Sequence, residues 1–156
     1  RVWTMTSIPI RSRPASREDL RADAEAIGIT EVYISTLVDS FYGHIRADDV
    51  LGPIFERRIG DDWDPHLARM KAFWGSVALY TGQYSGKPVP VHYAITEIEA
   101  GHFDHWLTLF EKTLEETAPT PDVVPYFMER ARRIAESLKL AIFGVPELQR
   151  ARGPKP

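Results

Sequence analysis

Residues 61–80, DDWDPHLARMKAFWGSVALY, carry the pattern that decides the fold of this chain. Apolar side chains recur every three or four residues along the stretch, which is typical of an amphipathic helix. Paired aspartates precede the pattern and Gly82 follows it, so the predicted helix begins at the aspartates and runs to about Tyr80. Its apolar face comprises Trp63, Met70, Phe73, Val77 and Tyr80.

His66 lies in the middle of that apolar face when successive residues are placed about 100° apart around the helix. A buried histidine must either satisfy both ring nitrogens with hydrogen bonds or bind a ligand. The sequence leaves two interpretations of His66 open, a core imidazole bonded to a backbone carbonyl and a functional side chain.

Two shorter helices are predicted before this one. Ser16, with Asp19 three residues later, is a weak capping signal for a short helix that ends at Gly28. Thr30 can cap the next helix, whose apolar stripe reaches Ile45.

Two segments that contain glycine and proline are predicted to be irregular. In residues 47–55 a Gly-Pro pair predicts a short turn that ends in Phe55. In residues 82–91 we predict a loop, because Pro88 and Pro90 cannot donate the backbone hydrogen bonds of a regular helix.

Two more helices are predicted after the loop. One covers roughly residues 102–117, and Thr120 as cap with Pro121 at the first position starts the other, which Gly144 ends. No segment alternates with a period of two, and the chain contains no internal repeat. The predicted fold class is therefore all-α, with a single domain over residues 16–144.

Both ends of the chain lack helical periodicity. We predict a flexible leader over residues 1–15 and a loose tail over residues 145–156. The leader has several arginines and no acidic residue before Glu18, which is also typical of a transit peptide. We favour the flexible leader.

The composition of the 156 residues excludes several classes of protein. Hydrophobic residues at 44% and charged residues at 26% are typical of a folded domain rather than a disordered chain. A net charge of −3, with interleaved signs, gives no basic surface for nucleic acid, and no apolar run reaches the ~18 residues that a membrane helix needs. The absence of cysteine excludes disulfides, zinc–thiolate sites, iron–sulfur clusters and covalently attached haem, and it fits a cytoplasmic protein.

Residues 91–106, VHYAITEIEAGHFDHW, hold three of the five histidines. His105 points away from the apolar face of its predicted helix, and His102 lies on the flank of that face. Glu99 and His102 form one Glu-x-x-His motif, but a di-iron bundle needs a second on a facing helix, and the chain has none. We therefore predict that His102 and His105 are solvated.

His92 is the remaining candidate in this stretch. It follows two prolines and has apolar neighbours, so a short rigid segment would present its imidazole. Such an imidazole, facing a second one from an apolar helix, is typical of a site that sandwiches a planar iron cofactor. His66 and His92 are 26 positions apart (92 − 66), which leaves room for a helix and a crossing loop.

From about Thr30 to Gly144 the chain resembles the truncated haemoglobins, specifically group III. Four stretches carry the resemblance in order: FYGHIRADDVLGPIFERRIG (41–60), DDWDPHLARMKAFW (61–74), GKPVPVH (86–92) and HFDHWLTLFEKTL (102–114). None of the ten glycines adjoins another, so the paired glycines of groups I and II are missing, as in group III.

The resemblance implies a shortened globin fold, a two-over-two helical sandwich, with an extra N-terminal helix. It implies b-type haem with His92 as the axial iron ligand. Three residues would surround the distal ligand position: Tyr42, His66 and Trp106. Four more would pack on the haem or line its pocket: Phe55, Met70, Phe73 and Trp74. For Phe55, Phe73 and Trp74 an ordinary place in the core is an equally open interpretation.

The resemblance also implies a function. The chain would bind O₂, NO or CO at haem iron and carry out redox chemistry on bound O₂, NO or peroxide, as a nitric-oxide dioxygenase or a peroxidase-like enzyme supplied by a reductase. The alternatives are a globin that stores or senses O₂ and a haem-free helical interaction domain in which His66 and His92 are structural. We expect a cytoplasmic monomer that binds neither nucleic acid nor membrane.

Overall fold

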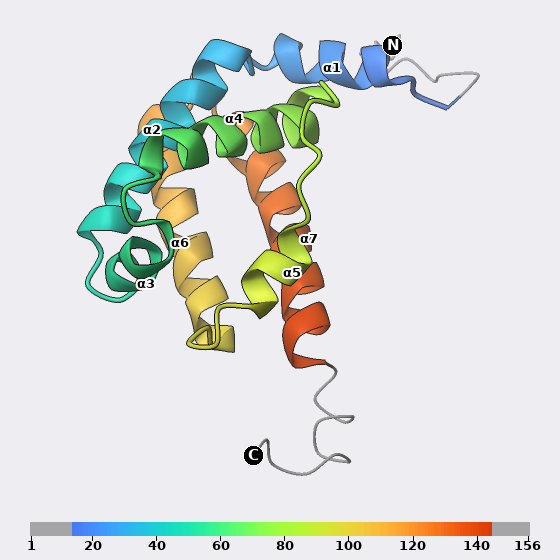
Figure 1. Ribbon diagram of the computed structural model, residues 1–156. Helices are drawn as coiled ribbons and strands as arrows, with labels where there is room; N and C mark the ends of the chain where they lie inside the picture. Colours follow the sequence, from blue (N-terminus) through green and yellow to red (C-terminus); the bar gives the residue numbers. More distant parts are fainter. Residues whose placement is uncertain (1–13, 145–156) are drawn as a thin grey trace, which may run out of the picture.

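The computed structural model describes residues 14–144, which form seven helices and no strand (Figure 1). The helices are α1 (Arg17–Ala26), α2 (Glu31–Ala47), α3 (Leu51–Ile59), α4 (Trp63–Leu79), α5 (Pro88–Tyr93), α6 (Ala100–Thr117) and α7 (Val123–Phe143). The all-α prediction is confirmed. The tail predicted over residues 145–156, and the leader apart from residues 14 and 15, lie outside the described part of the chain.

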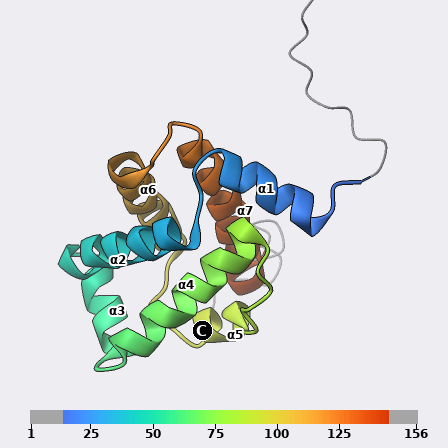
Figure 2. The ribbon, with the colours of Figure 1, turned by 90° about the horizontal axis from the view of Figure 1, so that it is seen from above.

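Two helix pairs form the body of the fold. Helices α2 and α4 pack together, α6 packs on α7, and α2 crosses α6 to join the two pairs. In Figure 1, α6 and α7 run down below α2 and α4, and Figure 2 shows the same layers from above. Helix α1 lies against α4, α3 follows α2, and α5 lies against α7. This arrangement confirms the predicted two-over-two sandwich with an extra N-terminal helix.

Four aromatic side chains tie the two layers together. Phe41 of α2, Trp74 of α4, Phe110 of α6 and Phe127 of α7 are all fully buried. The rings of Trp74 and Phe110 stack with centroids 4.9 Å apart, and Phe41 meets Phe110 edge-on at 5.1 Å. Burial of each such side chain contributes roughly 1.5–3 kcal/mol, so this contact fixes the crossing of the layers.

The two predicted helix caps near the N-terminus are confirmed. The Ser16 hydroxyl accepts the backbone N–H of Asp19, and the Asp19 carboxylate accepts the N–H of Ser16. The Thr30 hydroxyl accepts the backbone N–H of Tyr33. Gly28 follows α1 with φ of +103°, a conformation that favours glycine, and a side chain there would also meet Pro119 at 3.0 Å.

The turn predicted over residues 47–55 is wrong, because α3 begins inside it at Leu51. Pro53 occupies the third helical position, where a missing N–H costs no intrahelical hydrogen bond. The Asp48 carboxylate accepts the backbone N–H groups of Val50 and Leu51 at 3.1 and 2.8 Å. The Asp48 side chain thus stabilises the start of α3, although the sequence shows no helical periodicity here.

The loop predicted over residues 82–91 is wrong at its end, where α5 begins at Pro88. Pro88 and Pro90 are the first and third residues of α5, so neither occupies a position that needs an N–H donor within the helix. The two prolines therefore start a short helix instead of preventing one, and this helix carries His92.

The start predicted for the last helix is also wrong. Helix α7 begins at Val123, and the Thr120 hydroxyl donates to the carbonyl of Ile27 at 2.6 Å instead of capping the helix. This hydrogen bond ties the turn between α6 and α7 to the end of α1. No helix within residues 14–144 is long and apolar enough to cross a membrane.

Candidate functional site

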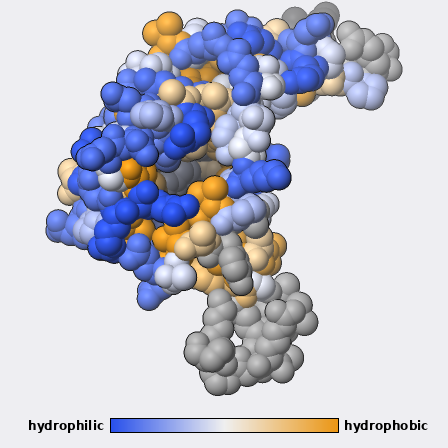
Figure 3. Space-filling model, viewed as in Figure 1, coloured by the Kyte–Doolittle hydropathy of each residue, from blue (hydrophilic) through white to orange (hydrophobic). Residues whose placement is uncertain are grey.

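The candidate site lies where α2, α3 and α4 face α5 across the molecule (Figure 1). Figure 3, drawn in the same view, shows the surface hollowed between α4 and α5, with hydrophobic residues around the hollow. Tyr42 comes from α2, Phe55 from α3 and His66 from α4, whereas His92 comes from α5. Segments from both sides of the hollow thus supply the predicted site residues.

Four ring-bearing side chains from α2, α3 and α4 form what we term the distal cluster: Tyr42, Phe55, Trp63 and His66. The ring centroids of Tyr42 and His66 are 5.0 Å apart, and those of Tyr42 and Trp63 are 6.0 Å apart. Trp63 and His66 are 5.8 Å apart, and Phe55 lies 5.9 Å from Tyr42. All of these contacts are edge-on. Because Tyr42 contacts each of the other three rings, it lies at the centre of the cluster.

Tyr42 provides a protonated hydroxyl in this cluster. Its side chain is only 5% exposed, and burial raises the pKa of the hydroxyl well above its usual value. The hydroxyl makes no hydrogen bond with any side chain or backbone group that the structure describes. The Tyr42 hydroxyl is therefore a hydrogen-bond donor without an acceptor among the described residues.

His66 provides a neutral imidazole. Burial, together with smaller electrostatic effects of Arg69 and His92, lowers the pKa of His66 to about 4. Its Nε2 atom is buried and has no hydrogen-bond partner in the described part of the chain. The alternative in which a backbone carbonyl satisfies this nitrogen is therefore absent from the structure.

Trp63 is a member of the cluster that the sequence did not single out as a site residue. Its side chain is 7% exposed, and its indole Nε1 is buried without a partner among the described residues. The signal available in the sequence was its spacing of three residues from His66, which places both side chains on one face of a helix.

His92 has one ring nitrogen engaged and the other available. Its Nδ1 lies 2.6 Å from the carbonyl oxygen of Pro88, one turn earlier in α5. A carbonyl only accepts, so Nδ1 carries the proton and the lone pair of Nε2 is free to bind a metal. His92 also contributes electrostatically to the low pKa of His66.

Trp106 is half-buried and packs against Phe41 and Phe110 rather than within the distal cluster. Its ring stacks on Phe110 with centroids 5.1 Å apart and meets Phe41 edge-on at 5.1 Å. Within residues 14–144 no ring contact joins it to Tyr42 or His66. The indole N–H makes no hydrogen bond among these residues, so it remains an available donor.

The other three predicted pocket residues differ in burial. Trp74 is 2% exposed and stacks on Phe110 at 4.9 Å, with Trp106 a second stacked neighbour at 6.5 Å, which is a place in the core. Phe73 is half-buried and lies edge-on to Trp74 at 5.2 Å. Met70 is half-buried and packs against the core. Phe73 and Met70 thus keep part of their surface free, whereas Trp74 has almost none.

His102 and His105 are partly exposed, as expected of solvated side chains, but each also makes a hydrogen bond that the sequence did not predict. His102 Nδ1 accepts the backbone N–H of Glu99, which caps the start of α6. His105 Nε2 lies 2.8 Å from both carboxylate oxygens of Asp48. Because Asp48 also caps α3, His105 ties α6 to the start of α3, a tertiary contact that no spacing rule reveals. This pairing and the backbone donors lower the pKa of the Asp48 carboxyl, despite its burial.

We expect His105→Ala to lower the free energy of unfolding by about 1 kcal/mol, because a hydrogen bond to a carboxylate is lost at a partly exposed site. His44→Ala is the matched control, since His44 pairs with Glu116 on the surface away from the helix cap. Urea denaturation of both variants measures the difference. Equal destabilisation would show that the link to Asp48 does not hold α3.

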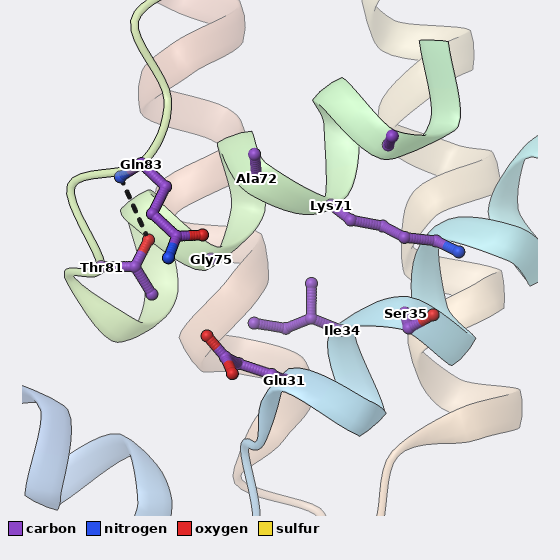
Figure 4. Close-up of a pocket in the computed structure, with 9 residues that line it drawn as sticks. Glu31, Ile34, Ser35, Lys71, Ala72, Gly75, Thr81 and Gln83 are labelled. Carbon is purple, nitrogen blue, oxygen red and sulfur yellow. Dashed lines mark hydrogen bonds between the residues drawn. The ribbon is translucent and has the colours of Figure 1, made fainter. Parts of the chain in front are cut away.

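A separate pocket of about 390 Å³ lies on the other side of α4, at its crossing with α2 (Figure 4). Its polar lining includes Glu31, Lys71, Thr81 and Gln83. None of the predicted site residues lines this pocket, and Lys71 is paired with Asp39 at 2.9 Å. It therefore does not belong to the candidate site.

The residues of the candidate site fit a haem group. His92 has a free Nε2 fixed by its hydrogen bond to Pro88, and His66 and Trp63 each present a buried polar atom without a partner. No group of three or more histidine, aspartate or glutamate side chains within residues 14–144 could hold a metal ion.

Comparison with known proteins identifies relatives of the chain. Residues 24–139 match the family described as bacterial-like globin. The chain is 30% identical over 118 residues to a group 3 truncated hemoglobin of Campylobacter jejuni, a match that covers 74% of this chain and 92% of the relative. The crystal structure of a group III truncated hemoglobin from the same organism superimposes with a TM-score of 0.70, at 30% identity and the same coverage.

Proposed function

Because this chain belongs to the bacterial-like globins and, among them, to the group III truncated haemoglobins, a family of haem proteins that bind diatomic ligands, we propose that it holds b-type haem through His92. The observation that carries the proposal is the hydrogen bond from His92 Nδ1 to Pro88, which leaves Nε2 free and aims the ring from a short helix. Such an outer hydrogen bond also raises the basicity of the ligating nitrogen.

The half-buried side chains around the hollow would hold the haem by apolar contact. Phe55, Met70 and Phe73 each retain exposed surface beside the distal cluster or α4. Trp74 would contribute mainly by stacking on Trp106, and not by direct contact with the haem. Haem iron, when bound, supplies the position at which O₂, NO or CO coordinates.

Two donors of this chain would hold the diatomic ligand. The Tyr42 hydroxyl is protonated, buried and not engaged by other described residues, and the Trp106 indole N–H is likewise available. Donors fixed in a dry pocket hold a polar ligand more strongly than donors in water. We infer slow ligand release, which suits chemistry on the bound ligand better than simple transport.

His66 would act as a gate and not as a donor or sixth iron ligand. Its imidazole is neutral and packs edge-on against Tyr42, the residue whose hydroxyl we propose as a donor to the ligand. Trp63 and Tyr42 flank the ring and restrict its approach to iron. The opposing hypothesis, coordination by His66, predicts a different spectrum.

We further propose that the loaded protein carries out redox chemistry on O₂, NO or peroxide with electrons from a reductase. The available donors and the slow release inferred from them support this over O₂ storage or sensing. Catalytic consumption of NO, measured with an NO electrode in the presence of O₂ and a chemical reductant, separates the two. A protein that binds O₂ but removes NO only once per haem would be a storage or sensing globin.

Titration of the purified protein with haemin tests the cofactor directly. We expect a Soret band that saturates at one haem per chain, because one axial histidine and one hollow are available. The reduced protein should show no low-spin spectrum of two coordinated imidazoles before CO is added. Absence of a Soret band would favour the haem-free interaction domain, and a low-spin reduced spectrum that disappears in His66→Ala would make His66 a ligand.

A further inference from the structure

Two buried polar atoms without hydrogen-bond partners lie in the same distal cluster. They are the indole Nε1 of Trp63 and the imidazole Nε2 of His66, whose ring centroids are 5.8 Å apart. Buried polar atoms are nearly always paired in native proteins, and each exception requires an explanation. Among the side chains that the structure describes, only these two have such an atom.

The two atoms are chemically complementary. An indole nitrogen can only donate a hydrogen bond, whereas a neutral imidazole accepts one at the nitrogen that lacks the proton. His66 is neutral because burial lowers its pKa to about 4. Trp63 and His66 are three residues apart on α4, a spacing that places their side chains on one face, one turn from each other.

Of the two rings, Trp63 is the fixed one. The guanidinium of Arg46 lies 4.4 Å from the centre of its ring, and Arg46 in turn donates to the Glu56 carboxylate at 3.0 Å. The Tyr42 ring covers another side of Trp63 at 6.0 Å. His66 has no such tether, because no hydrogen bond of its ring is formed among the described residues.

We propose that Trp63 is a positioning residue for the gate: its indole N–H donates to His66 Nε2 when the imidazole turns toward the start of α4, and this hydrogen bond holds the gate open. In the arrangement described, His66 packs against Tyr42 and both polar atoms are unpaired. The turn pairs both atoms and draws the imidazole off Tyr42. Trp63 therefore sets the balance between a closed and an open distal site, a role that rests on the proposed gate.

The association rate of CO with the reduced, haem-loaded protein tests this role. Trp63→Phe keeps an aromatic ring but removes the donor, so the closed arrangement gains population and association should slow by about threefold to tenfold. His66→Ala removes the gate and should speed association. In the His66→Ala background, Trp63→Phe should have no effect, because the acceptor is gone.

Arg46→Met is a second variant that leaves the buried ring in place. Arg46→Met removes the guanidinium that holds Trp63, and the change lies on the exposed side of the ring. CO association should therefore slow, as in Trp63→Phe. Equal or faster association in both single variants, with His66→Ala still fast, would overturn the role of Trp63 and leave the gate intact. An unchanged rate in His66→Ala would overturn the gate itself, and a Trp63→Phe effect that persists in that background would show that Trp63 acts without His66.

Discussion

The His92→Ala protein is expected to lose most of its haem during purification. His92 is the one candidate that combines a free Nε2 with a fixed ring, because its Nδ1 is engaged by the Pro88 carbonyl. Its removal leaves the haem with apolar contacts alone, which orient a planar group poorly. The Soret absorbance per chain after gel filtration measures the loss, with wild-type protein loaded in parallel.

Imidazole added to His92→Ala should restore haem retention and a spectrum close to that of the wild type, since the free base fills the space of the missing ring. The matched controls are His102→Ala and His105→Ala, which remove imidazoles that cap α6 or pair with Asp48 outside the distal cluster. Both should keep the wild-type spectrum. Wild-type spectra of His92→Ala in both oxidation states, without imidazole, would show that another residue binds the iron.

The helices that the sequence predicts well are those whose signals are local. The caps at Ser16 and Thr30, and the periodic stripe of α4, depend only on residues within a turn or two of one another. Such features need no knowledge of the rest of the fold. They were therefore available from the sequence, as was the all-α class.

The helices that the sequence misses depend on distant residues or on position within the first turn. Helix α3 forms although it contains Gly52 and Pro53, because Asp48 caps it and His105 holds Asp48 from α6. In α5 the prolines lie in the first turn, where a donor is not required. A prediction from periodicity treats proline as a break wherever it occurs.

The candidate site also combines features that local sequence predicts with features that depend on distant residues. The helical wheel places His66 on an inward face, but the meeting of His66 with Tyr42 follows from the crossing of α2 and α4. The roles of Tyr42 and His92 came from the resemblance to a known family, and the structure places the helices that carry them, α2 and α5, on either side of the hollow (Figure 1). Trp63 was missed because a tryptophan on an apolar stripe normally belongs to the core; only its unpaired Nε1 distinguishes it.

Release of O₂ is expected to be about tenfold to a hundredfold faster in Tyr42→Phe than in the wild type. The variant keeps the ring and its contacts with Phe55, Trp63 and His66 and removes only the hydroxyl. A donor to a polar ligand is worth ~1.5–3 kcal/mol in such a site, which corresponds to this range of rates. The effect should fall on dissociation, because most affinity changes do.

Trp106→Phe should also speed release, since it removes the second available donor while keeping an aromatic ring on Phe110. Stopped-flow mixing of the O₂-loaded protein with excess CO or dithionite measures both rates. Unchanged release in both variants would contradict the assignment of Tyr42 and Trp106 as donors. A change in Tyr42→Phe alone would leave Tyr42 as the donor and assign Trp106 to the core.

The free energy of unfolding distinguishes a tyrosine hydroxyl that binds the ligand from one that stabilises the fold. The Tyr42 hydroxyl has no partner among the described residues, so its removal should leave the free energy of unfolding of the haem-free protein unchanged or slightly higher. Tyr33→Phe is the matched control, because the Tyr33 hydroxyl is bonded to Thr117 at 3.0 Å, away from the distal cluster. That variant should lose about 1 kcal/mol of stability and release O₂ at the wild-type rate. The opposite pattern, a destabilised Tyr42→Phe with normal release, would mean that Tyr42 holds the fold and not the ligand.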